Sequence, residues 1–460
     1  MKRLLFAILF LLSAQSAQAT IYYVDKDNGC PGTGTTGDPY CSIQNAVNAV
    51  AAGDTIRIRD AASAYTEQIQ TNKAGTSGSP IIVEPDSGHN PTLYNTGNGG
   101  SCANFWFFGV ASYWTIQNLN FDASGQNTCV FGAILVNISI AFDITGIQIK
   151  NNIFKGWGHN SNVPFTPGMS AITITGGQGA DGSGNYPTDT LIEGNVFDSN
   201  YFYSITTSHT RNTTVRNNEI KGQKCGRGFD GATNEVGIYS TYYNEGMVVE
   251  ANLIHDFDTF GSCAIGIQPT PTFAAYWCDV GSHNATISNN VVYNLDQNGS
   301  PSDLNNVFSA FFVEAGCDSH TLKNNLMHHI KTMGIYSSYH SLGGATNFYY
   351  NNFISDTGFG FFMKEGVAEV KNNVIRNFSQ QGICHGCGSG SPALLSVTYN
   401  YNLYDDGTTQ TRIGYWSGVL DFANWKSTCS CDAQAINKHC HTRLRPRFSS
   451  SRMGLRYVCL

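Results

Sequence analysis

A short motif recurs nine times along this chain of 460 residues. Each copy reads apolar residue, two variable residues, asparagine, one variable residue and a second apolar residue. The copies are Ile149–Phe154, Ile192–Phe197, Val215–Ile220, Val249–Ile254, Ile287–Val292, Leu322–Met327, Tyr349–Ile354, Val370–Ile375 and Tyr399–Tyr404. Their asparagines follow one another at spacings of 21 to 43 residues. The shortest spacings fit one turn of a β-solenoid, and the longer ones fit a turn with an inserted loop.

The composition of each copy favours short strands that coil and stack. The flanking residues are β-branched or aromatic, and alternate side chains of such strands would face the inside of a coil. Asparagine tolerates a left-handed backbone at a bend, and stacked amides can donate to one neighbour and accept from another. A second apolar strand precedes most copies, as in Gly334–Tyr336 and Gly358–Phe362. We therefore predict an all-β, right-handed parallel β-helix with an asparagine ladder and three strands per coil.

The segment before the repeats has the pattern of a helical cap. Ser42 is a suitable N-cap, the apolar residues within Ile43–Val50 recur on one helical face, and Gly53 can end the helix. An exposed end of a β-solenoid is an aggregation hazard, which a helix would cover.

The first residues favour export. Lys2 and Arg3 precede the apolar run Leu4–Leu12, and small residues at 17 and 19 give a cleavage site, as in a secretory signal peptide. We predict a signal peptide at 1–19, a β-helix domain with its cap at 20–437, and a basic tail without the repeat at 438–460. The mature protein is expected to be secreted or periplasmic.

The cysteines agree with an oxidising compartment. The chain has 14 of them, and Cys30 with Cys41 and Cys102 with Cys129 are plausible local pairs, although the sequence leaves the connectivity open. The alternative is a zinc site at Cys384, Cys387, Cys429, Cys431 and the run from His439 to His441. Because an exported protein meets an oxidising environment, disulfides are favoured over a zinc site.

The charge distribution argues against a nucleic-acid partner. The formal net charge is −7, but eight Lys and Arg lie in the signal peptide and the tail, which contain no acidic residue. Without those eight, 18 basic residues face 33 acidic ones, a net charge of −15. A body this acidic repels nucleic acid, and its clustered carboxylates are a candidate for hard cations such as Ca²⁺. No segment predicts membrane insertion, and we expect a monomer.

The region from Ile21 to Asn437 resembles the pectate-lyase-like superfamily of secreted β-helix proteins, including its chondroitinase-B-like and alginate-lyase-like members. The resemblance rests on the asparagine repeats and on an entry segment that comprises Tyr22–Asp25, Gly37–Pro39, Ser42–Ala52, Gly53–Ile56 and Gly75–Val83. It implies a substrate groove along one sheet, a Lys or Arg base for eliminating a uronate, and Ca²⁺ held on carboxylates. The chain departs from the superfamily's finer motifs: paired lyase arginines are absent, and the one Asp-Asp pair, Asp405–Asp406, lies in a late turn.

Strand register selects the candidate catalytic residues. If Ile335 points inward, Tyr336 and Ser338 point outward, and the same count places Glu314 and Lys364 at the Ser338 position of the flanking coils. Glu314 and Lys364 would then lie about 10 Å apart on one groove. The apolar stretch before Lys364 would lower its pKa, so Lys364 is the candidate base, with Glu314 and His385 as further catalytic candidates.

Substrate and metal candidates come from the neighbouring positions. The substrate-binding candidates are Tyr239, Tyr336, Tyr339, His340 and Lys331, in which the tyrosines offer rings for sugar stacking. The candidate Ca²⁺ ligands are Asp256, Asp258 and Glu314, although the two aspartates fit turn-making residues better than calcium ligands.

The leading hypothesis is a secreted polysaccharide lyase that cleaves an acidic, uronate-containing glycan by β-elimination, with Ca²⁺ as the candidate cofactor. The alternative from another class is a non-catalytic β-helix that binds carbohydrate or serves in surface adhesion. A uronate epimerase ranks third because it shares the proton abstraction. A glycoside hydrolase ranks last because the sequence shows no paired carboxylates on a strand face.

Overall fold

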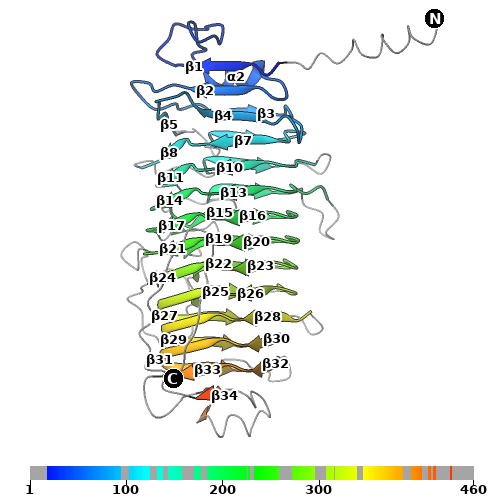
Figure 1. The fold of residues 1–460 in the computed structure, drawn as a ribbon, viewed down its shortest axis with the longest axis vertical. Coiled ribbons are helices and arrows are strands. Elements are labelled where there is room, and N and C mark those ends of the chain that lie inside the picture. Colours follow the sequence, from blue (N-terminus) through cyan, green and yellow to red (C-terminus); the bar gives the residue numbers. More distant parts are fainter. Residues whose placement is uncertain are drawn as a thin grey trace, which may run out of the picture.

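The computed structural model is a right-handed parallel β-helix in which short coils stack along one axis (Figure 1). It describes residues 18–94, 103–124, 132–137, 143–157, 170–177, 184–224, 226–227, 233–257, 272–295, 307–314, 316–338, 345–386, 395–406, 413–415, 418–420 and 436–437. The predicted fold class is confirmed. Nearly all of the predicted signal peptide and the whole of the tail 438–460 lie outside the described residues, so those boundaries stay predictions.

The first face of the helix is one parallel sheet, in which each strand pairs with its equivalent in the next coil. Its strands are β1 (Ile21–Val24), β2 (Thr55–Ile58), β4 (Ile81–Pro85), β7 (Trp114–Gln117), β10 (Gln148–Lys150), β13 (Leu191–Glu193), β16 (Thr214–Arg216), β20 (Val248–Glu250), β23 (Thr286–Ser288), β26 (Thr321–Lys323), β28 (Asn347–Tyr350), β30 (Gly366–Lys371) and β32 (Leu395–Asn400).

The second face follows the first after a sharp bend. Its strands are β5 (Thr92–Leu93), β8 (Asn120–Asp122), β11 (Ile153–Lys155), β14 (Val196–Asp198), β17 (Glu219–Lys221), β21 (Leu253–His255), β24 (Val291–Leu295), the first halves of β27 (Leu326–Ser337), β29 (Phe353–Met363) and β31 (Val374–His385), and then β33 (Leu403–Asp405) and β36 (Ile436–Asn437).

The third face carries the longer strands. They are β3 (Ile69–Thr71), β6 (Phe105–Phe107), β9 (Ile134–Asn137), β12 (Ser170–Thr175), β15 (Tyr203–Ser208), β19 (Thr233–Thr241), β22 (Thr272–Asp279), β25 (Val307–Val313), the second halves of β27, β29 and β31, and β34 (Ile413–Tyr415). Two short strands, β18 (Gly226–Arg227) and β35 (Gly418–Leu420), pair antiparallel with β19 and β34.

An asparagine ladder holds the bend between the first and second faces. The side-chain amide of Asn195 donates to the carbonyl of Ile149 at 2.9 Å and to Oδ1 of Asn218 at 3.0 Å, and its own Oδ1 accepts from Asn152 at 3.1 Å. The same bonds repeat through Asn252, Asn290, Asn325, Asn352, Asn373 and Asn402. The predicted ladder is confirmed. The left-handed backbone, however, falls on the residue before each ladder asparagine, such as Asn151 at φ 55°.

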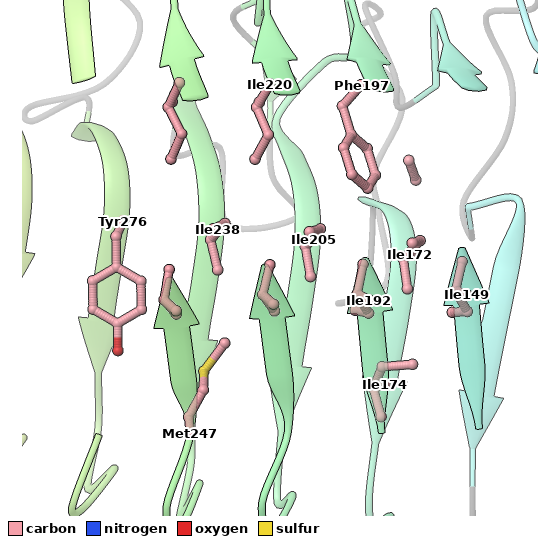
Figure 2. Packing of buried hydrophobic residues seen from close by; sticks show 14 of the residues in the cluster. Ile149, Ile172, Ile174, Ile192, Phe197, Ile205, Ile220, Ile238, Met247 and Tyr276 are labelled. Atoms are coloured by element: carbon pink, nitrogen blue, oxygen red, sulfur yellow. The ribbon is translucent and has the colours of Figure 1, made fainter. Parts of the chain in front are cut away.

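The interior is filled by stacked apolar side chains. Ile149, Ile192, Ile205 and Ile238 are fully buried and line the inside of successive coils (Figure 2). Each such side chain stabilises the fold by about 1.5–3 kcal/mol through the burial of apolar surface. A coil by itself leaves the upper and lower faces of these side chains in water, so the stack folds as one unit.

The glycines that begin the third-face strands are required by the close approach of neighbouring coils. Gly334, Gly360 and Gly382 occupy equivalent positions, one residue before the paired Ile335, Phe361 and Ile383. A Cβ added to Gly334 would lie 2.7 Å from the carbonyl oxygen of Gly360, which is too close for any side chain.

The predicted cap is also present. Helix α2 (Ile43–Ala49) begins at Ser42, whose hydroxyl accepts a bond from the backbone of Asn45, and it buries Ile43, Ala46 and Val47. The carboxylate of Glu67 accepts from two further free N–H groups of the first turn. Figure 1 shows α2 beside β1 and β2 at the N-terminal end of the stack.

Disulfides confirm part of the cysteine prediction. Cys30 pairs with Cys41, and Cys278 pairs with Cys317 across 39 residues, a pair that the sequence did not reveal. Cys384 is disulfide-bonded as well, which agrees with the favoured disulfide interpretation and excludes Cys384 from the alternative zinc site. The remaining zinc candidates and the predicted pair of Cys102 with Cys129 lie outside the described residues. Among the described residues, no helix is both long and apolar enough to cross a membrane.

Candidate functional site

The ends of five third-face strands place five side chains in one outward row, which we call the site row. Thr241 pairs with Asp279 in the next coil. Glu314, Ser338 and Lys364 follow the paired residues Val313, Ser337 and Met363, and their backbone N–H groups continue the ladder to the preceding coil. The predicted register of Glu314, Ser338 and Lys364 is therefore confirmed.

The direction of the site row follows from alternation along the strands. Ile335 belongs to the interior core, whereas Tyr336 belongs to a separate cluster on the outer surface of the third face. Ser338, two residues after Tyr336, continues the outward direction.

An aromatic ladder lies two residues before the site row and supports it. Its rings are those of Tyr239, Trp277, Phe312, Tyr336 and Phe362, with successive centroids 4.7 to 5.6 Å apart. Tyr336 is only 7% exposed because Phe312 and Phe362 cover its ring. The ring of Tyr239 packs against those of Tyr203 and Trp277, with centroids 4.5 and 4.8 Å away. Neither Tyr336 nor Tyr239 therefore presents a free ring face for sugar stacking, contrary to the sequence-based expectation.

Two members of the aromatic ladder donate hydrogen bonds to the site row. The indole N–H of Trp277 donates to Oε2 of Glu314 at 3.1 Å, and the hydroxyl of Tyr239 donates to Oδ2 of Asp279 at 2.8 Å. Burial raises the pKa of Glu314 to about 7, and the nearby Asp279 adds to the rise, while Trp277 and Lys364 oppose it. Burial also raises the pKa of Asp279, against its bonds from Tyr239 and Val280. Glu314 is thus suited to both accepting and donating a proton near neutral pH.

Lys364 supplies the positive charge of the site row. It is partly buried, two strands from Glu314, and its charge favours the ionised form of that carboxylate. Ser338 lies between them in the register, is 1% exposed, and its hydroxyl has no hydrogen-bond partner within the described part of the chain. The row therefore combines a proton-transfer group, a hydroxyl and a cation.

His385 and Lys331 do not join the site row. His385 pairs with the inward Met363, and its Nδ1 lies 3.0 Å from the hydroxyl of the core residue Tyr399. Burial lowers the pKa of His385 to about 4. Lys331 lies where β27 bends between the second and third faces, at the opposite end of the third-face segment from Ser338. Neither residue is placed to act with Glu314.

Asp256 belongs to another edge of the helix. It follows β21, with its carboxylate bonded to His255 at 2.7 Å and to Asn294 at 2.8 Å. His255, Tyr293 and His328 stack there with centroids 4.8 and 5.1 Å apart. Asp256 precedes the third face and Glu314 follows it, so a whole strand separates the two positions.

The described residues do not fit the Ca²⁺ site that the resemblance implies. Calcium takes six to eight oxygen ligands, and Asp256 and Glu314 lie too far apart to share one ion. The candidates Asp258, Tyr339 and His340 lie outside the described residues. His320 lies near Cys278 and Cys317, but these cysteines are joined in a disulfide and cannot serve as thiolate ligands.

Two residues of the site were missed by the sequence reasoning. Asp279 and Trp277 end β22, which lacks the Gly-Ile start used to count the register, and the counting stopped at Glu314. The sequence signal for Asp279 was its position: it follows Cys278 as Glu314 follows Val313, and Cys278 and Val313 pair in adjacent strands.

Comparisons with known proteins support the fold. No protein-family model and no curated protein match this chain. Among solved structures, it is similar to the GH136 lacto-N-biosidase from Eubacterium ramulus, with 14% identity, a TM-score of 0.53, and coverage of 79% of this chain and 64% of that chain. An alginate lyase from Paenibacillus matches with 14% identity, a TM-score of 0.39, and coverage of 73% and 95%. Pectate lyase Pel9A matches with 14% identity, a TM-score of 0.33, and coverage of 83% and 77%.

The chain thus spans 64% of the length of the lacto-N-biosidase that it matches. At 14% identity the similarity to the lacto-N-biosidase supports the parallel β-helix fold alone, and a shared fold does not by itself imply a shared function.

Proposed function

We propose that this chain is a secreted or periplasmic carbohydrate-active enzyme that cleaves an acidic, uronate-containing glycan by β-elimination at Glu314 and Lys364. The observation that carries the proposal is the environment of Glu314, whose raised pKa near 7 occurs in the same outward row as Lys364. Perturbed carboxyl groups that lie beside a cation on a sheet face are characteristic of proton-transfer sites.

The roles follow from charge. The ammonium group of Lys364 pairs with the uronate carboxylate and stabilises the negative charge that develops on it. Ionised Glu314 removes the proton from the carbon next to that carboxylate, the C–H electron pair forms the double bond, and the glycosidic C–O bond breaks. Protonated Glu314 then returns its proton to the departing oxygen. These roles transfer the base from Lys364, the candidate of the sequence analysis, to Glu314.

A second candidate, glycoside hydrolysis, is favoured by the pairing of Asp279 with Glu314. Adjacent strands are about 4.8 Å apart, close to the separation of about 5–5.5 Å between the carboxyl groups of retaining glycosidases. The sequence shows no paired carboxylates on a strand face, whereas the fold brings Asp279 and Glu314 onto adjacent strands.

One experiment separates the candidates. Purified protein is incubated with pectate, alginate and chondroitin sulfate, with calcium and with chelator. Elimination produces an unsaturated uronate with ultraviolet absorbance, whereas hydrolysis releases reducing ends without it. We expect absorbance that is lost in Glu314→Gln and Lys364→Ala and retained in Glu365→Gln, the neighbouring acid outside the site row.

Other outcomes identify the alternatives. Reducing ends without absorbance would assign hydrolysis. Exchange of the uronate proton without cleavage would indicate an epimerase. Binding without either would return the protein to the non-catalytic carbohydrate-binding or adhesion class.

A further inference from the structure

A cavity of about 500 Å³ lies on the third face near the N-terminal end of the helix, far from Glu314 along the stack. It is lined by Gln70, Asn72, Trp106, Phe108, Gly109, Val110 and Asn137. The Trp106 and Phe108 rings lie with centroids 6.1 Å apart at 61°, so they form two walls of a corner.

The lining of this pocket matches the chemistry of an uncharged sugar. Indole and phenyl rings pack against the apolar C–H face of a pyranose, and the amides of Gln70, Asn72 and Asn137 can bond its hydroxyls. Among the described residues, the seven that line the pocket are all uncharged, so none of these seven would neutralise a uronate carboxylate. Val110 is 45% exposed, which leaves an apolar surface open at the rim.

Trp106, which lines this pocket, carries an unsatisfied polar group. Its indole nitrogen is shielded from solvent and has no hydrogen-bond acceptor within the described residues. An unpaired buried donor costs about 1–3 kcal/mol, which an oxygen acceptor from a ligand would offset after a small shift of the ring.

The pocket and the site row share one line along the third face. Asn137 pairs with Thr175, Thr175 with Ser208, and Ser208 with Thr241, the first residue of the site row. Thr175 and Ser208 are partly exposed and have small hydroxylated side chains, so the line between the pocket and the site is low and polar.

The distance along this line suits one extended glycan. Five strand steps separate Asn137, the lining residue nearest to the site row, from Glu314, through Thr175, Ser208, Thr241 and Asp279. Trp106 lies one coil further from Glu314. At about 4.8 Å per step the separation is about 24 Å, or about five sugar units.

We infer that the Trp106 pocket is a distal subsite that binds a neutral sugar unit of the same glycan whose acidic unit binds at Lys364. The inference rests on the proposed function and deepens it: the substrate is a mixed glycan in which neutral units lie about five positions from the cleaved bond. Binding energy at this distance from the reacting bond would position the chain over Glu314.

The test measures binding in the Glu314→Gln background, which is not expected to cleave. The probes are xylan, which is neutral, polygalacturonate, which is wholly acidic, and glucuronoxylan, which contains both kinds of unit. We expect the tightest binding to glucuronoxylan. Trp106→Ala should weaken binding to xylan and glucuronoxylan about tenfold and leave polygalacturonate unchanged. Tyr401→Ala, an exposed tyrosine outside the third face, is the matched control and should change none of the three.

Two results would overturn the inference: equal affinity of the Trp106→Ala protein and its background for all three glycans, or a background protein that binds neither xylan nor glucuronoxylan. Should Trp106→Ala not fold, Asn137→Ala gives the same comparison, because that side chain is exposed. Turnover is a separate readout. If Glu314→Gln retains full activity on a cleaved glycan, the proposed function fails, while the dependence of xylan binding on Trp106 is still decided.

Discussion

The indole N–H of Trp277 lies 3.1 Å from Oε2 of Glu314, on the neighbouring strand of the same sheet face. This bond stabilises the charged form of a carboxyl group whose pKa is otherwise raised by burial and by Asp279. The pKa of Glu314 therefore reflects a balance that a single side chain can change.

Replacing Trp277 by Phe is predicted to raise the pKa of Glu314. The substitution removes the N–H donor and keeps an aromatic ring, so the pKa of Glu314 should rise further above 7. If ionised Glu314 is the base, the acidic limb of the pH–rate profile of kcat/KM should shift to higher pH. Phe362→Leu changes packing in the same ladder without removing a hydrogen bond and should leave the midpoint in place. An unshifted profile in Trp277→Phe would exclude Glu314 as the titrating base.

The pH dependence of stability gives an independent check on Glu314. Its folded pKa of about 7 lies above its ordinary value of 4.5, so the folded state holds the proton more tightly. This contribution is present in full below about 4.5 and is lost as the pH rises through 7. Glu314→Gln cannot ionise and should lose less stability between pH 5 and 8, by on the order of 1–3 kcal/mol. Denaturant unfolding across this range measures the difference, and Glu365→Gln should follow the wild-type curve.

The sequence predicted the fold more fully than the site because the two depend on different kinds of information. The motif that contains the ladder asparagine occurs nine times, so the repeat cannot be a chance match. Alternation along β27 correctly assigned the directions of Ile335, Tyr336 and Ser338. It could not reveal that Phe312 and Phe362 cover the ring of Tyr336, because coverage depends on side chains from other coils. Asp279 was missed because its strand, β22, lacks the glycine that marks the aligned segments of β27 and β29.

Asn290 lies in the middle of the asparagine ladder, so replacing it measures how much the ladder contributes to the free energy of unfolding. Its amide donates to the carbonyl of Val249 and to Asn325, and its Oδ1 accepts from the backbone and side chain of Asn252. Asn290→Ala leaves several buried groups without partners, at about 1–3 kcal/mol each, so a loss of at least about 3 kcal/mol is expected. The control is Asn289→Gly, which keeps the left-handed backbone at φ 58° and should change stability little. Equal losses in the two variants would mean that the ladder amides contribute no more than the bend.

The disulfide between Cys278 and Cys317 joins the coils that carry Asp279 and Glu314. It closes a segment of 39 residues, and its loss is predicted to cost about 2–4 kcal/mol, chiefly by freeing the unfolded chain. The double variant Cys278→Ala, Cys317→Ala should unfold at lower denaturant concentration than the wild type. Removal of the Cys30–Cys41 pair, which closes only 11 residues at the N-terminal end, should cost less. A larger loss of stability on removing the Cys30–Cys41 pair would contradict the explanation that these disulfides act chiefly by restricting the unfolded chain.

Among the described residues, Tyr242 is a tyrosine beside the site row whose ring is exposed. It follows Thr241 directly, is 46% exposed, and stacks on His209 with centroids 5.9 Å apart. An exposed ring held by a neighbour on one face offers the other face to a sugar at the Thr241 end of the site row, two coils from Glu314. Tyr242→Ala should therefore raise KM severalfold and leave the midpoint of the pH–rate profile unchanged, because the ring supplies uniform binding and no proton transfer. Tyr401→Ala removes an equally exposed ring away from the third face and should alter neither quantity. A Tyr242→Ala protein with unchanged KM on every glycan that the enzyme cleaves would place the substrate elsewhere than across the end of β19.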